Sequence, residues 1–365
     1  MQSNERSPID LSALGWTPRL ADAFAPHAAD GLIPARVALE HTHIYRVFTG
    51  AGEWLARVSG RLRHRAAVRV DFPAVGDWVA IEPPAEGADA RIRAVLPRSS
   101  RFSRRAAGDP TEEQIVAANI DTVFLVSGLD GDFNPRRIER YLVVAGDSGA
   151  TPVIVLNKAD LIDDVASVVE DVRAVAAGVD VHAVSCRTPE SLDVLRRYLR
   201  HGQTGALLGS SGVGKSSIVN QLIGHEMLRT REVRASDSKG RHVSTARQLV
   251  MLPGEGVLID TPGMRELQLW ESGDAVGGTF NDIEERAAGC RFRDCQHRTE
   301  PGCAVRAAVT AGEIPAIRLE SFHKLQGEQA YQARQQDERA LLEEKRRSKI
   351  GSKALQKRLK DKNRL

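Results

Sequence analysis

Residues 209–216 read GSSGVGKS and match the phosphate-loop pattern GxxxxGK[ST]. An apolar stretch at 206–208 precedes the pattern and a helix-forming stretch at 216–223 follows it, which predicts a strand, a glycine-rich loop and a helix. Such a loop turns its backbone N–H groups toward phosphate oxygens at the positive end of the helix. The motif therefore predicts an α/β domain with a nucleotide-phosphate site.

We expect different residues of this loop to contact different parts of the bound phosphates and Mg²⁺. Lys215 would reach the β- and γ-phosphates, where it would also assist catalysis, and the Ser216 hydroxyl would ligate Mg²⁺. The remaining contacts to nucleotide are expected from Gly209, Ser210, Ser211, Gly212, Val213, Gly214 and Ser217. The alternative interpretation, a Gly/Ser-rich turn before an ordinary helix, does not explain the strand–loop–helix context.

A second motif, NKAD at 157–160, follows an apolar strand predicted at 153–156. The Asp160 carboxylate can accept hydrogen bonds from N1–H and from the exocyclic amine of guanine, whereas adenine offers no such pair of donors. We expect Asn157 at the O6/N7 edge of the base, with the Lys158 stem and Ala159 beside it. The motif favours GTP and GDP over ATP.

A further base contact is expected after the strand predicted at 181–184. Ser185 and Cys186 follow this strand, and a backbone N–H there would donate to the guanine oxygen. Cys186 also fits a small buried thiol without a binding role.

A third motif, DTPG at 260–263, ends the strand predicted at 257–259. Its carboxylate, Asp260, would hold the Mg²⁺ shell, and the Gly263 N–H would sense the γ-phosphate. Residues 236–248 between this motif and the phosphate loop would form a switch. Within it we expect Thr245, in preference to Ser244, to supply a hydroxyl to Mg²⁺ and to catalysis.

Met264 stands where Ras-like proteins place the glutamine that orients the attacking water. A thioether cannot do this, so intrinsic hydrolysis is expected to be slow. His242, another loop residue or a partner would supply the missing group, although His242 also fits an exposed loop histidine.

The order of the motifs differs from that of ordinary GTPases, because the NKAD motif precedes the phosphate loop and the DTPG motif comes last. The same site can be assembled if the domain is circularly permuted, since the termini of compact domains commonly lie close together. We therefore predict a circularly permuted, doubly wound and mostly parallel sheet over residues 106–275.

The N-terminal part lacks helical periodicity. Residues 1–34 form a proline-containing lead-in, and residues 35–100 hold five short β-rich runs separated by turn residues, which predict a small closed barrel. We assign it as an OB-fold, although an SH3-like barrel would produce the same pattern. A basic hinge at 98–105 follows.

A cluster of metal-ligand residues lies in the predicted C-terminal module, residues 280–330. Cys290, Cys295, His297 and Cys303 occupy 14 residues, and a Cys₃His set suits one structural Zn²⁺ with no open coordination position. A disulfide would leave one of the three thiols unpaired.

Charge is concentrated at the end of the chain. Residues 345–365 carry ten Lys or Arg and one acid, a charge of +9, so the other 344 residues sum to −6 within a total of +3. We expect residues 331–365 to be a basic helical or disordered tail that contacts RNA, or else a solubilising end. With four Cys, no signal segment and no membrane span, a cytoplasmic chain is expected.

Together, NKAD, GSSGVGKSS, GRHVST, DTPG and C-x4-C-x-H-x5-C, behind a small barrel, resemble the circularly permuted GTPase family of bacterial ribosome small subunit-dependent GTPase A. The resemblance covers about residues 35–330. It implies an OB-fold, a GTPase domain and a zinc-binding domain, with GTP hydrolysis stimulated by the small ribosomal subunit during its late maturation. Val243 and Ser244 depart from the family's threonine run, which puts the identity of the switch hydroxyl in doubt.

Two other functions compete with this interpretation. An RNA-binding scaffold could use GTP as a structural ligand with little turnover, which Met264 keeps open. An ATP-dependent enzyme would require the NKAD motif to be accidental. Nothing in the sequence demands more than a monomer that contacts the small subunit and its rRNA.

Overall fold

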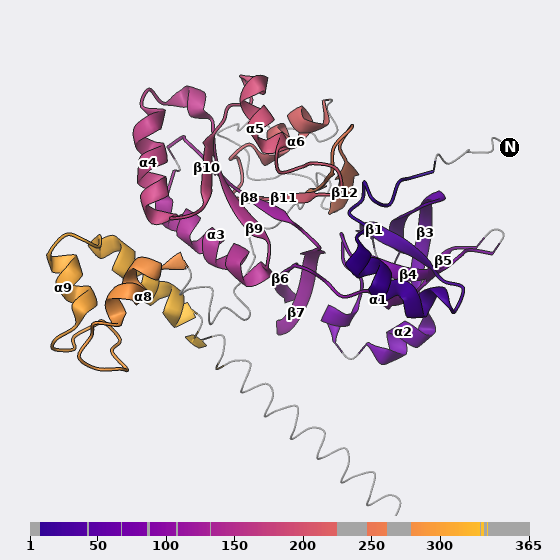
Figure 1. The fold of residues 1–365 in the computed structure, drawn as a ribbon, viewed down its shortest axis with the longest axis horizontal. Coiled ribbons are helices and arrows are strands. Elements are labelled where there is room, and N and C mark those ends of the chain that lie inside the picture. Colours follow the sequence, from indigo (N-terminus) through magenta and orange to yellow (C-terminus); the bar gives the residue numbers. More distant parts are fainter. Residues whose placement is uncertain are drawn as a thin grey trace, which may run out of the picture.

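The structure is a computed structural model of the 365-residue chain, which describes residues 8–41, 44–66, 68–85, 88–106, 109–131, 133–224, 247–260, 279–328, 330–331 and 334. An N-terminal barrel, a central α/β domain and a small C-terminal module follow one another along the long axis of the molecule (Figure 1). The basic tail at 345–365 lies outside the described residues.

The N-terminal barrel has five strands: β1 (Ile33–His41), β2 (Ile44–Thr49), β3 (Gly52–Val58), β4 (Trp78–Glu82) and β5 (Ala90–Val95). They pair in the order β1-β2-β3-β5-β4, and β4 pairs back with β1, which closes the barrel. The β3–β5 pair is parallel and the other four are antiparallel. This closed arrangement is that of an OB-fold and confirms the prediction over the SH3-like alternative.

A helix that the sequence did not predict packs on the barrel beside β1 and β4. In α1 (Pro18–Ala28), the Thr17 side chain accepts from the Leu20 N–H, and proline occupies the first position, where its missing N–H is not needed. Trp16, just before the helix, contacts Trp78 of β4 edge-on, with ring centroids 4.8 Å apart. These aromatic contacts order part of the predicted lead-in.

The central domain is a sheet in the order β10-β9-β8-β11-β13-β12, in which the first five strands are parallel and β12 is antiparallel. The bounds are β8 (Thr122–Gly128), β9 (Thr151–Asn157), β10 (Asp180–Ala183), β11 (Thr204–Gly209), β12 (Gln248–Met251) and β13 (Val257–Asp260). The sheet confirms the predicted α/β fold.

Helices cover both faces of this sheet. Val123 and Leu125 of β8 belong to the core beneath α3 (Pro135–Ser148) and α4 (Val165–Val175). The alternating residues Phe124 and Val126 belong to the core beneath α5 (Asp193–Arg196) and α6 (Lys215–Ile223). This alternation is what a strand buried on both faces requires.

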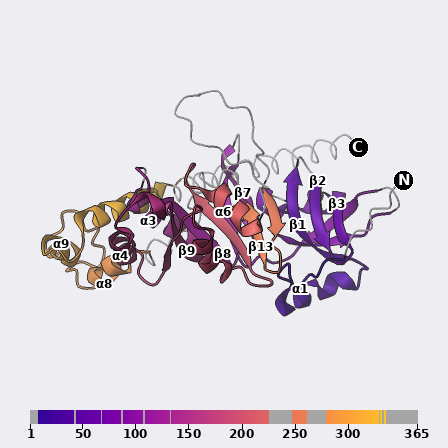
Figure 2. The same ribbon diagram turned by 90° about the horizontal axis from the view of Figure 1, so that it is seen from above.

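Two features join the barrel to the central sheet. The predicted basic hinge contains β6 (Arg101–Ala106), which forms a hairpin with β7 (Asp109–Ala118). In addition, β12 pairs with β1 at Gln248 and Leu39, so that the barrel and the α/β strands form one hydrogen-bonded sheet (Figure 2). The sequence predicted neither the hairpin nor β12.

A buried arginine lies at the same junction. Arg36 of β1 is 1% exposed and donates to the carbonyls of Leu14, Gly76 (3.2 Å) and Asn119 (3.0 Å) and to the Thr204 hydroxyl (2.9 Å) at the start of β11. Burial lowers the pKa of Arg36 to about 10, so the guanidinium remains charged at neutral pH. One side chain thus ties the lead-in, the barrel and the α/β sheet together.

The C-terminal module (residues 279–328) consists of α8 (Asn281–Ala287), the cysteine-bearing loop, α9 (Ala304–Thr310) and a helical segment over 316–328. The remaining short elements are α2 (Gly60–Arg65) and three 3₁₀ turns, Arg69–Asp71, Ala159–Leu161 and Pro189–Leu192. Among the described residues, no helix is both long and apolar enough to cross a membrane.

We predict that Arg36→Met lowers the free energy of unfolding by about 3 kcal/mol or more, because buried acceptors lose a charged donor. Chemical denaturation measures this loss. The matched control is Arg57→Met, which removes an ion pair of a 51%-exposed arginine with Asp89 and should cost less than about 1 kcal/mol. Equal losses for the two variants would contradict the role assigned to Arg36.

Candidate functional site

The phosphate loop connects β11 to α6 at the carboxyl edge of the parallel sheet. α6 begins at Lys215, and the loop before it contains two glycines with positive φ, Gly212 (78°) and Gly214 (97°). The Lys215 ammonium donates to the carbonyls of Gly209 (2.7 Å) and Ser210 (2.6 Å) and so lies across the loop. The strand, loop and helix that the sequence predicts are all present.

Two glycines of the loop leave no room for a side chain. A Cβ at Gly209 would lie 2.3 Å from the Val126 carbonyl oxygen of the adjacent strand β8. A Cβ at Gly214 would lie 2.1 Å from the side-chain nitrogen of Asn157. The loop can approach β8 and the NKAD motif this closely only because both positions are glycine.

Asn157 links the NKAD motif to the phosphate loop. Its side chain is 2% exposed, and its amide nitrogen donates to the Val213 carbonyl at 2.8 Å. Its amide oxygen lies 3.8 Å from the Cys186 sulfur. The structure therefore brings together two motifs that are 52 positions apart in the sequence, counted from Asn157 to Gly209.

Asp160 presents its carboxylate at the surface beside Asn157. Oδ1 accepts from the Ser185 hydroxyl at 2.5 Å, and Oδ2 lies 3.3 Å from the Arg187 guanidinium. The Ser185 hydrogen bond is the main reason that the pKa of Asp160 lies below its ordinary value, so the carboxylate stays ionised at neutral pH. An ionised acceptor is the form that can receive two donors from a guanine edge.

Ser185 contacts the NKAD motif through its side chain. Its own N–H donates to the Ser191 hydroxyl at 2.9 Å, and its hydroxyl donates to Asp160. A base contact from a backbone N–H of the segment formed by Ser185 and Cys186 stays a prediction. The Cys186 thiol is half-buried, and burial raises its pKa, which favours the neutral thiol.

The NKAD turn is held from two sides. Lys158 has a left-handed backbone (φ 64°), and its ammonium pairs with the Asp130 carboxylate at 2.5 Å. The Ala159 N–H donates to the Val184 carbonyl at 3.1 Å, which ties the turn to the end of β10. Asp130 lies in the segment after β8 and was not identified from the sequence, because no motif marks it.

Two side chains of α3 contact the phosphate loop, and no sequence pattern marks either of them. Arg137 donates to the Ser210 hydroxyl at 3.0 Å, and the Tyr141 hydroxyl lies 3.2 Å from the same oxygen. Their spacing of four residues places them on one face of the helix. A helical pattern alone does not indicate what this face contacts.

Asp260 ends β13, two strands from β8 on the same edge of the sheet. Burial raises the pKa of its carboxyl, and the charge of Lys215 opposes this rise. A nearby cation would therefore stabilise the ionised form of the Asp260 carboxylate. Ser216 and Ser217 are half-buried in the first turn of α6, and Ser211 and Gly212 are exposed.

Several predicted residues lie outside the described part of the chain. They are His242, Ser244 and Thr245 of the switch, together with Gly263 and Met264 after β13.

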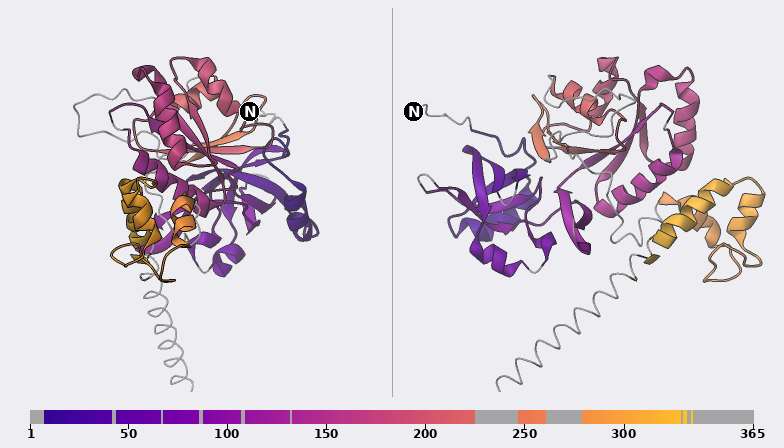
Figure 3. Two further views of the ribbon diagram at one scale, coloured as in Figure 1. Left: turned by 60° about the vertical axis from the view of Figure 1, so that its left-hand side comes forward. Right: turned by 180° about the vertical axis from the view of Figure 1, so that it is seen from behind.

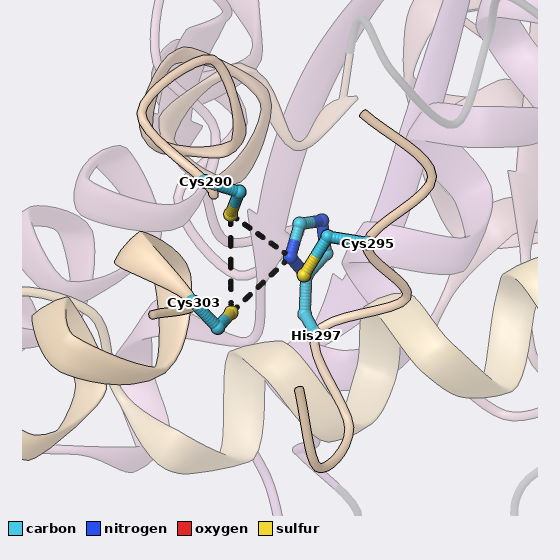
Figure 4. A group of neighbouring side chains, drawn as sticks. All are labelled: Cys290, Cys295, His297 and Cys303. Carbon is cyan, nitrogen blue, oxygen red and sulfur yellow. Dashed lines mark hydrogen bonds between the residues drawn. The ribbon is translucent and has the colours of Figure 1, made fainter. Parts of the chain in front are cut away.

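The four metal-ligand residues of the C-terminal module converge in space, as Figure 4 shows. The Sγ atoms of Cys290 and Cys303 are 3.9 Å apart, and His297 Nδ1 lies 3.6 Å from the first and 3.4 Å from the second. All four ligand atoms, including that of Cys295, lie within 4.8 Å of one another. His297 has a left-handed backbone (φ 57°) that brings its ring into the cluster.

These distances can be compared with those around a tetrahedral ion. With Zn–S and Zn–N bonds of about 2.3 and 2.05 Å, two sulfurs would be about 3.8 Å apart and a sulfur and a nitrogen about 3.6 Å. The cluster fits an ion of this size, and its four ligands would leave no position for a catalytic water.

The geometry as a whole is suited to nucleotide binding at the edge of the sheet. The loop offers backbone donors and an ammonium for phosphates, and Asp160 offers an ionised acceptor for a base. The half-buried carboxylate of Asp260 lies near the Lys215 ammonium, and a divalent cation would be stabilised beside this carboxylate.

Comparisons with known proteins agree with this arrangement. A family model described as RsgA GTPase matches residues 95–270. The small ribosomal subunit biogenesis GTPase RsgA of Opitutus terrae is 49% identical over 338 residues, covering 90% of this chain and 92% of that protein. The protein of the same name from Streptomyces coelicolor is 43% identical over 354 residues, covering 95% of each.

Two solved structures resemble the fold. YjeQ from Thermotoga maritima superimposes with a TM-score of 0.62 and 28% identity, over 81% of this chain and 99% of that one. YloQ, described as a circularly permuted GTPase, does so with a TM-score of 0.58 and 25% identity, over 81% and 94%. The permuted order of the motifs agrees with this likeness.

We predict that Gly214→Ala weakens GTP binding at least about tenfold, equivalent to about 1.4 kcal/mol. The new Cβ would displace Asn157 from the loop. The measurement is titration with a fluorescent GTP analogue.

Gly224→Ala is the matched control, because Gly224 has a similar φ of 83° but a Cβ there meets nothing within 4 Å. It should lose stability and keep its affinity. A similar loss of affinity in both variants would show that backbone strain alone, and not the contact with Asn157, is responsible.

Proposed function

The chain belongs to the RsgA GTPase family, and on this premise we propose that it hydrolyses GTP to assist small ribosomal subunit biogenesis. The observation that supports this function best is the hydrogen bond from Asn157 to the Val213 carbonyl. It joins a guanine-type motif to a phosphate loop, so that one nucleotide can span both. The curated relatives are named for small ribosomal subunit biogenesis, which supports the same role here.

Base recognition in this proposal rests on Asp160. Its two oxygens would accept from N1–H and the exocyclic amine of guanine, with the Ser185 hydroxyl keeping the carboxylate oriented and ionised. Arg187, which pairs with Oδ2, is largely exposed and can move aside as the base enters. The Lys158 stem would lie along the base, held at its far end by Asp130.

Phosphate binding in this proposal rests on the loop and on Lys215. The ammonium would exchange the carbonyls of Gly209 and Ser210 for the β- and γ-phosphates, which carry more charge. Mg²⁺, held by Ser216 and Asp260 with Thr245 of the switch, would supply charge stabilisation between these phosphates. The Gly263 N–H would detect the γ-phosphate.

Hydrolysis needs a group that orients water, and Met264 cannot supply it. We propose His242 of the switch for this role, with the small subunit completing the catalytic site. Slow turnover by the free protein and fast turnover on the subunit follow from this arrangement.

The parts of the chain outside the GTPase domain would attach the protein to the small ribosomal subunit. One structural Zn²⁺ in the Cys290, Cys295, His297 and Cys303 cluster would hold the loop of the C-terminal module in place. The exposed arginines of α2 and its flanks, together with the basic tail, would contact rRNA phosphates. We propose that the protein acts as a monomer in the cytoplasm.

The experiment that tests this function is GTP turnover with and without purified small ribosomal subunits. We predict a stimulation of at least about tenfold, since a partner that completes a GTPase site can accelerate it by far more. Lys215→Ala should abolish turnover under both conditions. Arg173→Ala, an exposed change on α4, should match the wild type.

Tight GTP binding without stimulation would contradict the proposal and favour the scaffold alternative. Competition by ATP as effective as that by GTP would contradict the assigned base specificity.

A further inference from the structure

Among the described residues of the central domain, those of helix α3 make polar contacts with both the phosphate loop and the C-terminal module. We propose that α3 positions the phosphate loop for GTP and that Arg318 of the C-terminal module fixes α3 for this task. Arg137, Tyr141 and Glu139 are then positioning residues of the nucleotide site. This inference rests on the proposed function, because it concerns how the same site binds GTP.

One face of α3 is directed to the loop. Arg137 and Tyr141, four residues apart, both contact the Ser210 hydroxyl, at 3.0 and 3.2 Å. Ser210 is also the residue whose carbonyl accepts from the Lys215 ammonium. A displacement of α3 would therefore move Ser210 and with it the backbone of the phosphate loop.

The adjacent face of α3 is directed to the C-terminal module. Glu139 is buried, and its Oε1 accepts from Arg318 at 2.9 Å. Residues 136, 139 and 140 share this face, since positions three and four apart in a helix are neighbours. Arg136 pairs with Glu320 and Arg140 with Glu328, both in the helical segment 316–328. Figure 3 shows the module beside the α3 and α4 side of the sheet in both views.

Arg318 is the centre of this second contact. Its guanidinium also binds Asp282 through two donors, at 2.6 and 2.8 Å, and donates to the carbonyls of Thr279 and Val175. Its Cζ lies 4.8 Å from the centre of the Phe280 ring. Burial would lower the pKa of Arg318, but its bonds to Asp282 and Glu139 outweigh burial and raise it.

The Arg318–Glu139 bond is the part of this contact that depends most on the exact place of α3. The Arg318 and Glu139 side chains are nearly buried, at 7% and 5% exposure, whereas the side chains of the flanking pairs are 29–70% exposed and contribute less. Within the described residues, Glu139 Oε2 is buried without a hydrogen-bond partner. Glu139 therefore depends on Arg318 to remain buried as a charge.

The two contacts of α3 would couple GTP binding to the docking of the C-terminal module. If α3 must be in one position for both contacts, then docking of the module favours GTP binding, and GTP binding favours docking by the same factor. Two changes on different faces of α3 would then act on one equilibrium, that between the positions of this helix. Changes at sites that share no partner normally have independent effects.

The test is a double-mutant cycle on GTP affinity in the full chain. Tyr141→Phe removes only the hydroxyl at Ser210. Glu139→Gln removes the charge that faces Arg318 and replaces one acceptor oxygen with an amide donor. We expect each to weaken GTP binding about threefold or more. The double variant should be no weaker than the weaker single variant. Matched controls are Tyr198→Phe, which removes a hydroxyl bound to Asp180, and Glu170→Gln, an exposed change on α4.

Multiplied effects in the double variant, or an unchanged affinity in Glu139→Gln, would overturn the inference. A second measurement does not depend on Glu139→Gln folding. GTP should slow amide hydrogen exchange in residues 316–328 of the wild type but not of Tyr141→Phe, and equal exchange with and without GTP in the wild type would overturn the inference. A wild type that binds no GTP would instead refute the proposed function itself.

Discussion

The nucleotide site depends on the parallel pairing of β9, β8, β11 and β13, because this pairing brings the carboxyl ends of all motif-bearing strands to one edge. Asn157 lies opposite Gly128 of β8, and Gly209 lies opposite Val126 of the same strand. Asp260 ends the strand on the other side of β11. The position of a motif in space is thus set by its strand and not by its order in the chain, which is why a permuted sequence can build the same site.

Two buried arginines connect the outer parts of the molecule to this sheet. Arg36 bonds to Thr204, the first residue of the strand that leads into the phosphate loop, and to groups of the barrel and lead-in. Arg318 bonds to Glu139 on the helix that contacts Ser210. The strand before the loop and the helix beside it are therefore each tied to a different outer part. Arginine suits both places, because its planar fork can donate to several acceptors at once.

The sequence was sufficient where local chemistry decides the structure. The phosphate loop, the buried strand predicted at 153–156, which is β9, and the Cys₃His cluster follow from glycine freedom, β-branched runs and ligand spacing. The sequence did not predict the elements that depend on contacts between residues far apart in the chain. α1 is stabilised by Trp16 packing on Trp78, and β12 by its pairing with β13 and β1, which no local pattern records. The roles of Arg137 and Arg318 arise in the same way, since a helical arginine most often lies in solvent.

The central claim is that the NKAD motif and the phosphate loop serve one guanine nucleotide, and the most direct test is the base preference of Asp160→Asn. Asparagine offers one acceptor and one donor in place of two acceptors. Xanthine carries a carbonyl where guanine carries its exocyclic amine. We predict that the variant binds GTP roughly 100-fold more weakly or worse and binds xanthosine triphosphate more tightly than GTP. Unchanged GTP binding, or an equal loss for both nucleotides, would contradict the account.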